Sequence, residues 1–142
     1  MDREKLAEEL LSTFENINTE NIINRLKLSV KGENAVLFLL HEHGGISTPG
    51  KLSEHIDFTA ARLSAIIKSL ENKGLVERNR NSEDKRSTTV ILTAEGYRQF
   101  IKLRDEIVRN ALTIIEQLGE KDVREFLRIV KRLLDITSTC AE

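Results

Sequence analysis

The sequence predicts a mainly α-helical protein that contains a small β-hairpin, and three observations carry this prediction. Apolar side chains recur every three or four residues through most of the chain, which is the spacing of amphipathic helices. Between residues 75 and 93 this spacing gives way to two short runs rich in Val, Ile and Thr that flank a polar loop, as in a hairpin. The helix before the hairpin begins near Phe58 and is followed by Gly74, a residue type that commonly ends helices.

The first two expected helices lie before the glycine pair at residues 44 and 45. Residues 2–26 carry apolar side chains at broadly helical spacing, but the polar stretch 18–21 can break or bend this helix, because Asn and Thr side chains compete for backbone hydrogen bonds. A second helix within residues 33–43 is apolar nearly all round and should therefore be buried. The residues that give it this character are Val36, Leu37, Leu39 and Leu40.

A helix-turn-helix is expected next. Residues 46 and 47 can form one short strand, and Thr48 then caps a short third helix, Pro49 to His55, with the proline at its first position. Thr59 can cap the fourth helix, and Phe58, just before it, can act as a hydrophobic staple. Two helices a few residues apart, the second of them amphipathic, are typical of a helix-turn-helix.

Two further helices follow the hairpin. Thr93 caps a helix from Ala94 to Leu118, which spans about 37 Å at 1.5 Å per residue, too long for a domain of this size to cover. Gly119 ends it, and residues 121–136 form the last helix.

The helices at the two chain ends have apolar stripes broader than one compact lobe could cover. We therefore expect a homodimer in which these helices interdigitate, although a monomeric bundle could use the same stripes as an internal core. The residues expected in the dimer interface are Leu6, Leu10, Phe14, Leu112, Ile115, Phe126, Val130, Leu133 and Leu134.

Composition and charge narrow the function. The chain has 142 residues, 39% hydrophobic and 32% charged, which suits one domain with a buried core. No apolar run approaches the roughly 18 residues that span a membrane, and the N-terminus does not resemble a signal peptide, so we expect a cytoplasmic protein. The net charge is only −1, but residues 58–88 hold seven Lys and Arg against four Asp and Glu. The positive charge is therefore local, around the fourth helix and the hairpin.

The start of the fourth helix has the chemistry of a DNA-reading helix. Thr59 offers a hydroxyl to a phosphate, and the small side chains of Ala60 and Ala61 let the backbone approach base edges. Ala can contact a thymine methyl, and Arg62 belongs to the residue type that most often reads guanine. The alternative is that Arg62 only solvates an exposed helix face.

The pattern LSEHI, then a helix ending SLENKGLVER, then EDKR and VILTAEG resembles the MarR family of bacterial winged helix-turn-helix transcriptional regulators. The match is close from about residue 32 to 98, while the end helices agree in order and length only. The resemblance implies a single domain over residues 1–142, with a DNA-binding lobe at 32–93 and dimerisation helices at 1–30 and 94–138.

The resemblance also implies how such a protein works. The fourth helix would lie in the DNA major groove and the hairpin, called the wing, on the adjacent minor groove. Many members have a pocket between the lobe and the dimer helices, so a small aromatic or phenolic effector is expected. Many also carry Arg or Lys where this chain has Ala65 and Ser69, so the operator sequence cannot be carried over. The absence of cysteine from the first helix argues against the peroxide-sensing subgroup.

The wing adds further candidate contacts. In the family-like hairpin, Asp84 can brace an arginine while Lys85 or Arg86 reaches the minor groove, whose negative potential attracts arginine. Arg78 and Arg80 share one face of their strand by its period of two and are expected to contact phosphates or the minor groove. The full set of expected DNA contacts is Thr48, Lys51, Thr59, Ala60, Ala61, Arg62, Ser64, Lys68, Arg78, Arg80, Lys85 and Arg86.

Catalysis and metal binding find little support. His41, Glu42 and His43 form the densest group of possible metal ligands, but helical positions two apart point about 200° away from each other and cannot share an ion. No phosphate loop or nucleophile motif occurs, so we expect no enzyme, cofactor or metal. Two hypotheses remain: a ligand-responsive repressor that binds a pseudo-palindromic operator as a homodimer, and a winged-helix protein-interaction module. The basic segment and Arg62 favour the repressor.

Overall fold

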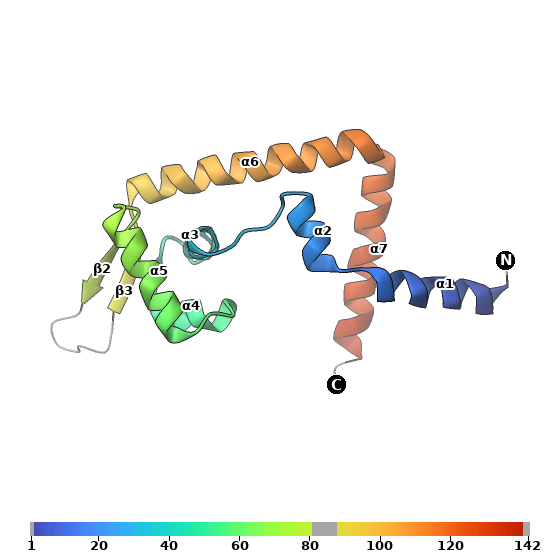
Figure 1. Ribbon diagram of the computed structural model, residues 1–142, viewed down its shortest axis with the longest axis horizontal. Coiled ribbons are helices and arrows are strands. Elements are labelled where there is room, and N and C mark those ends of the chain that lie inside the picture. Colours follow the sequence, from blue (N-terminus) through green and yellow to red (C-terminus); the bar gives the residue numbers. More distant parts are fainter. Residues whose placement is uncertain (1, 81–87, 141–142) are drawn as a thin grey trace. The chain divides into compact units, whose positions relative to one another are not determined.

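The computed structural model describes residues 2–80 and 88–140. The chain forms two compact units, one from Ser29 to Glu106 and one from the residues up to Leu28 together with those from Ile107 onward. The elements in chain order are α1 (Arg3–Asn16), α2 (Thr19–Arg25), α3 (Glu33–Glu42), β1 (Ile46–Ser47), α4 (Pro49–His55), α5 (Ala60–Asn72), β2 (Val76–Arg80), β3 (Thr88–Leu92), α6 (Ala94–Leu118) and α7 (Glu120–Thr139) (Figure 1). The predicted winged helix-turn-helix is therefore confirmed: α4 and α5 form the helix-turn-helix, and β2 and β3 form the wing.

The sheet has three antiparallel strands in the order β1-β3-β2. Val76 lies opposite Leu92 at one end of the hairpin, and Arg80 lies opposite Thr88 at the other. The short strand expected at residues 46 and 47 pairs with the outer side of β3, a partner that the sequence did not predict. The two buried valines of the hairpin, Val76 and Val90, belong to the same core as the residues of α3, α4 and α5.

The core of the first unit lies between α3, α4, α5 and the sheet. The four α3 residues named from the sequence, Val36, Leu37, Leu39 and Leu40, are all buried, as predicted, because this helix has neighbours on several sides. The remaining buried members of this core are Leu52, Leu63, Ile67, Leu70, Val76 and Val90. Phe58 is half-buried and packs against the same core.

Three threonines begin three helices, as the sequence predicted. The Oγ1 of Thr48 accepts the N–H of Lys51 at 3.2 Å, and the Oγ1 of Thr59 accepts the N–H of Arg62 at 3.1 Å. Each bond satisfies a backbone donor that has no partner inside its own helix. Thr93 does the same for α6 through the N–H of Gly96 at 3.0 Å. The start and direction of α4, α5 and α6 are thus set by local chemistry.

The expected break in the first helix occurs and divides it into α1 and α2. Ile17 has an extended backbone, and the Asn18 side chain accepts the N–H of Asn21 at 3.0 Å, which starts α2. The break therefore follows from the competition by Asn side chains that the sequence indicated. The last helix, Glu120–Thr139, is longer at both ends than the predicted 121–136.

The second unit differs from the first because α1, α2 and α7 contain no buried residue. Large apolar side chains are exposed along all three helices, among them Phe14, Ile22 and Phe126. The search for membrane spans, made over the described residues, finds no helix with the length and apolar character needed to cross a bilayer.

Candidate DNA-binding surface

The candidate surface is built on α5, which turns one side to the core and the other to solvent. Leu63, Ile67 and Leu70 are buried, and they recur at the helical period on one side. The predicted contacts Ala60, Ala61, Arg62, Ser64 and Lys68 are all exposed. The structure therefore brings the candidate residues of α5 onto its solvent side, with Arg62 about 100° round the helix from Ala61.

Both the backbone and the side chain of Arg62 are held in place. Its backbone N–H donates to the Thr59 cap, and its guanidinium carbon lies 4.1 Å from the centroid of the Phe58 ring. In the part of the chain that the structure describes, no carboxylate pairs with Arg62. Its N–H donors thus remain available, and the reading of a base by Arg62 stays a prediction.

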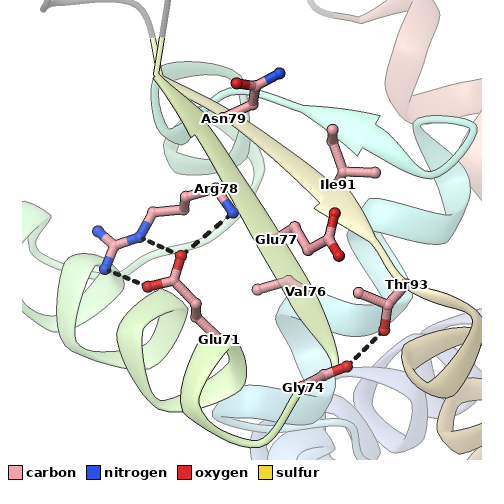
Figure 2. Close-up of a pocket in the computed structure, with 8 residues that line it drawn as sticks. All are labelled: Glu71, Gly74, Val76, Glu77, Arg78, Asn79, Ile91 and Thr93. Atoms are coloured by element: carbon pink, nitrogen blue, oxygen red, sulfur yellow. Dashed lines mark hydrogen bonds and ion pairs between the residues drawn. The ribbon is translucent and has the colours of Figure 1, made fainter.

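Arg78 and Arg80 differ in their surroundings although they occupy the same face of β2. Arg78 turns toward α5, where its Nε and Nη2 donate to the Glu71 carboxylate at 3.3 and 3.2 Å, and its backbone N–H donates to the same group (Figure 2). Glu77, the preceding residue of β2, points to the opposite face in Figure 2. Arg80 is exposed. Arg78 therefore joins the wing to α5, and its contact with DNA stays a prediction.

The Glu71 carboxylate is part of the same contact between α5 and the hairpin. The hydrogen bond from Arg78 lowers the pKa of Glu71, and the nearby charge of Arg80 acts in the same direction. Glu71 and Arg78 line a pocket of about 580 Å³ between the end of α5 and the hairpin (Figure 2). Sequence reasoning missed Glu71. The available signal was its place in SLENKGLVER, seven residues before Arg78 and across the turn at Gly74.

A second ion pair holds the C-terminal end of α5 to α3. Glu33, in the first turn of α3, accepts hydrogen bonds from Lys73 Nζ at 2.6 Å and from the Ser69 hydroxyl. These bonds, that of Lys73 first, lower the pKa of Glu33. Sequence reasoning noted Ser69 only as a departure from the family pattern. Here the Ser69 hydroxyl helps to fix α5 against α3.

A cleft between α4, α5 and the hairpin is lined by three of the predicted contacts, Ala60, Ser64 and Arg78. The cleft has a volume of about 320 Å³, and residues Pro49, Ser64 and Arg78 line it from three elements. Lys51 is exposed on α4, while Thr48 is half-buried and occupied as the helix cap. The remaining expected contacts, Lys85 and Arg86 with the bracing Asp84, lie outside the described residues.

The rings of His41 and His43 contact different groups. The His41 ring stacks on Phe100 with 3.9 Å between centroids, while His43 Nδ1 lies 2.7 Å from the Ser47 hydroxyl. Over residues 2–80 and 88–140, no group of three or more His, Cys, Asp or Glu could hold a metal ion. The one cysteine, Cys140, is exposed at the end of α7.

Comparisons with known proteins match this arrangement. A model of the MarR family matches residues 32–88. The organic hydroperoxide resistance transcriptional regulator of Bacillus subtilis (strain 168) is 32% identical over 99 residues, which cover 70% of this chain and 65% of that protein.

Two solved structures extend the similarity to nearly the whole chain. The crystal structure of the MarR family transcription regulator SP03579 has a TM-score of 0.70 and 20% identity, covering 98% of this chain and 94% of that one. NadR in complex with 4-hydroxyphenylacetate has a TM-score of 0.56 and 27% identity, covering 94% and 86%.

Proposed function

The chain belongs to the MarR family of winged helix-turn-helix transcriptional regulators, and we propose that it is a cytoplasmic repressor that binds a pseudo-palindromic DNA operator as a homodimer. One observation carries the proposal: the solvent side of α5 presents small side chains beside Arg62 and Lys68, while its other side is buried. Small side chains allow close approach to base edges, and the cations supply contacts to bases and phosphates.

The charges near α5 favour DNA over a protein partner. Among the described residues, the exposed cations Arg62, Lys68 and Arg80 have no carboxylate within ion-pair distance. Unpaired cations around a helix-turn-helix suit a polyanion, because each phosphate contact releases condensed counterions from DNA. A winged-helix protein-interaction module would not need this arrangement.

Dimerisation is supported by the apolar side chains of the second unit. The side chains expected in the interface are 44% to 64% exposed at Leu6, Leu10, Phe14, Leu112, Phe126, Leu133 and Leu134. Ile115 and Val130 are half-buried. Burying apolar surface contributes about 25 cal/mol per Å², so a second copy that covered these exposed side chains would stabilise the dimer. A two-fold dimer would present two copies of α5, and it would therefore suit an operator with two pseudo-palindromic half-sites.

We further propose that a small aromatic or phenolic effector controls DNA binding. The support is family membership and the solved complex of NadR with 4-hydroxyphenylacetate. An effector can release DNA only if it binds one conformation of the dimer more tightly than the other. Titration of the protein–DNA complex with 4-hydroxyphenylacetate and other phenols tests this part of the proposal, and a complex insensitive to all of them would contradict it.

The experiment for the main proposal is a set of binding isotherms on DNA from upstream of the protein's own gene. We expect tight, salt-dependent binding to one segment and much weaker binding to a scrambled duplex of the same length and composition. Equal affinity for all duplexes would contradict sequence-specific binding. No binding to any duplex at low salt would favour the protein-interaction module.

A further inference from the structure

Phe58 lies one residue before the cap of α5 and contacts both the core of the first unit and Arg62. One part of its side chain packs against the core of the first unit, so the ring is fixed. Its face lies beneath the guanidinium of Arg62, with 4.1 Å between the Arg62 Cζ and the ring centroid. The ring is thus fixed by its packing against the core, and its face contacts the guanidinium of Arg62.

The geometry of this stack leaves the chemistry of Arg62 intact. A guanidinium stacks through its planar face, whereas its five N–H donors point outward in the plane. Contact with the Phe58 ring therefore occupies no donor. The backbone of Arg62 is fixed as well, because its N–H donates to Thr59 Oγ1 at 3.1 Å.

An arginine that is unsupported must lose much of its rotamer freedom when it binds a base, which weakens binding. A stacked arginine has lost part of that freedom before DNA arrives. We propose that Phe58 is a positioning residue that orients Arg62 for base recognition, and so contributes to sequence specificity through Arg62. This inference rests on the proposed function, because it assumes that Arg62 contacts a base.

The test uses Phe58→Leu, which keeps an apolar side chain against the core and removes the ring, and Phe58→Tyr, which keeps the ring. Ile56→Val is the matched control, because Ile56 also packs against the core and makes no stack with Arg62. Binding isotherms on cognate and scrambled duplexes are measured for each variant, and for Phe58→Leu combined with Arg62→Ala.

We expect Phe58→Leu to weaken cognate binding about two- to fivefold, the size of an exposed cation–π contact, with little change on scrambled DNA. Phe58→Tyr and Ile56→Val should bind like the wild type. In the Arg62→Ala background, Phe58→Leu should have no further effect. A loss of the same size in that background, or on scrambled DNA, would show that Phe58 acts only through the fold and would overturn the inference.

A measurement without DNA separates this inference from the proposed function. Protons held over an aromatic face shift upfield, so the Arg62 side-chain resonances should shift upfield in the wild type and in Phe58→Tyr. They should return to ordinary values in Phe58→Leu. If these resonances are ordinary in the wild type, the stack is absent and the inference fails while DNA binding can stand. If the shift is present and no duplex is preferred, the proposed function fails, and the positioning role fails with it.

Discussion

Replacing Gly96 with alanine should destabilise the protein, because the first turn of α6 passes directly over the start of β2. A Cβ at position 96 would lie 2.0 Å from the Leu75 carbonyl oxygen and 2.8 Å from Leu92 Cδ1. Real Cβ atoms essentially never come closer than 3.0 Å to such atoms, so the two backbone segments would have to separate by about 1 Å. The same Leu75 oxygen accepts the N–H of Thr93 at 3.1 Å, and this separation would weaken that bond.

The expected cost follows from these two effects. Overpacking of a close contact costs about 1 to 3 kcal/mol, and a lost backbone hydrogen bond costs about 1 kcal/mol. We therefore expect Gly96→Ala to lower the free energy of unfolding by about 2 to 4 kcal/mol. Gly50→Ala is the control, because the nearest atom to its Cβ, Thr48 Oγ1, is 4.0 Å away and the residue is in α4. That change should be neutral or stabilise the protein by up to about 1 kcal/mol.

The assay is urea unfolding of both variants and the wild type at one fixed protein concentration, since the stability of the proposed dimer would depend on concentration. A midpoint for Gly96→Ala equal to that of Gly50→Ala would refute the reasoning. It would mean that α6 can move away from β2 at no cost.

Three further predictions concern function and pH. Arg62→Ala should weaken binding by about 1 to 3 kcal/mol on cognate DNA and by much less on scrambled DNA, whereas Lys68→Ala should weaken binding to both alike and reduce the salt slope by about one. Binding isotherms at several salt concentrations check this. Equal losses on both duplexes for Arg62→Ala would make Arg62 a contact to the DNA backbone. Replacing Leu133 and Leu134 with Asp should place charge in the proposed dimer interface, at a cost of several kcal/mol, and should give a monomer or an unfolded chain when followed by sedimentation. A wild type that sediments as a monomer at all concentrations would contradict the dimer. The lowered pKa of Glu33 means that its bonds stabilise the folded state above the ordinary glutamate value of 4.5, and that this stabilisation is lost as pH falls through the folded pKa. Glu33→Gln should therefore lose stability at pH 7 and approach the wild type at low pH, in unfolding curves measured across that range.

The elements whose limits depend on neighbouring residues could be predicted from the sequence. Thr48, Thr59 and Thr93 cap their helices through bonds to residues three positions later, so spacing alone identifies them. The bounds of α4, Pro49–His55, and α6, Ala94–Leu118, agree with the prediction for this reason. The buried face of α3 was also predictable, because it is apolar nearly all round.

What the sequence could not indicate depends on contacts across the fold. The carboxylate that pairs with Arg78 could have been Glu77 on the same strand, yet alternation along β2 turns Glu77 away and brings Arg78 to Glu71. The stack of Arg62 on Phe58 depends on the angle at which the chain enters α5. The close approach behind Gly96 depends on where α6 crosses β2. The Glu71 pair and the close approach at Gly96 are set by how separate elements pack, and the Arg62 stack by side-chain orientations that a spacing of four residues permits but does not fix.

These tertiary contacts also change how the local positive charge is interpreted. Carboxylates pair with two of the cations in or next to α5 and β2, since Glu33 pairs with Lys73, the residue that follows α5, and Glu71 pairs with Arg78. Both pairs lie toward the C-terminal end of α5 and brace it against α3 and the wing. The other cations of α5 and β2, Arg62, Lys68 and Arg80, have no carboxylate partner among the described residues, and they should contribute to the salt dependence of DNA binding. Lys73→Ala therefore tests this division directly: it removes the same charge as Lys68→Ala, but it should leave the salt slope unchanged.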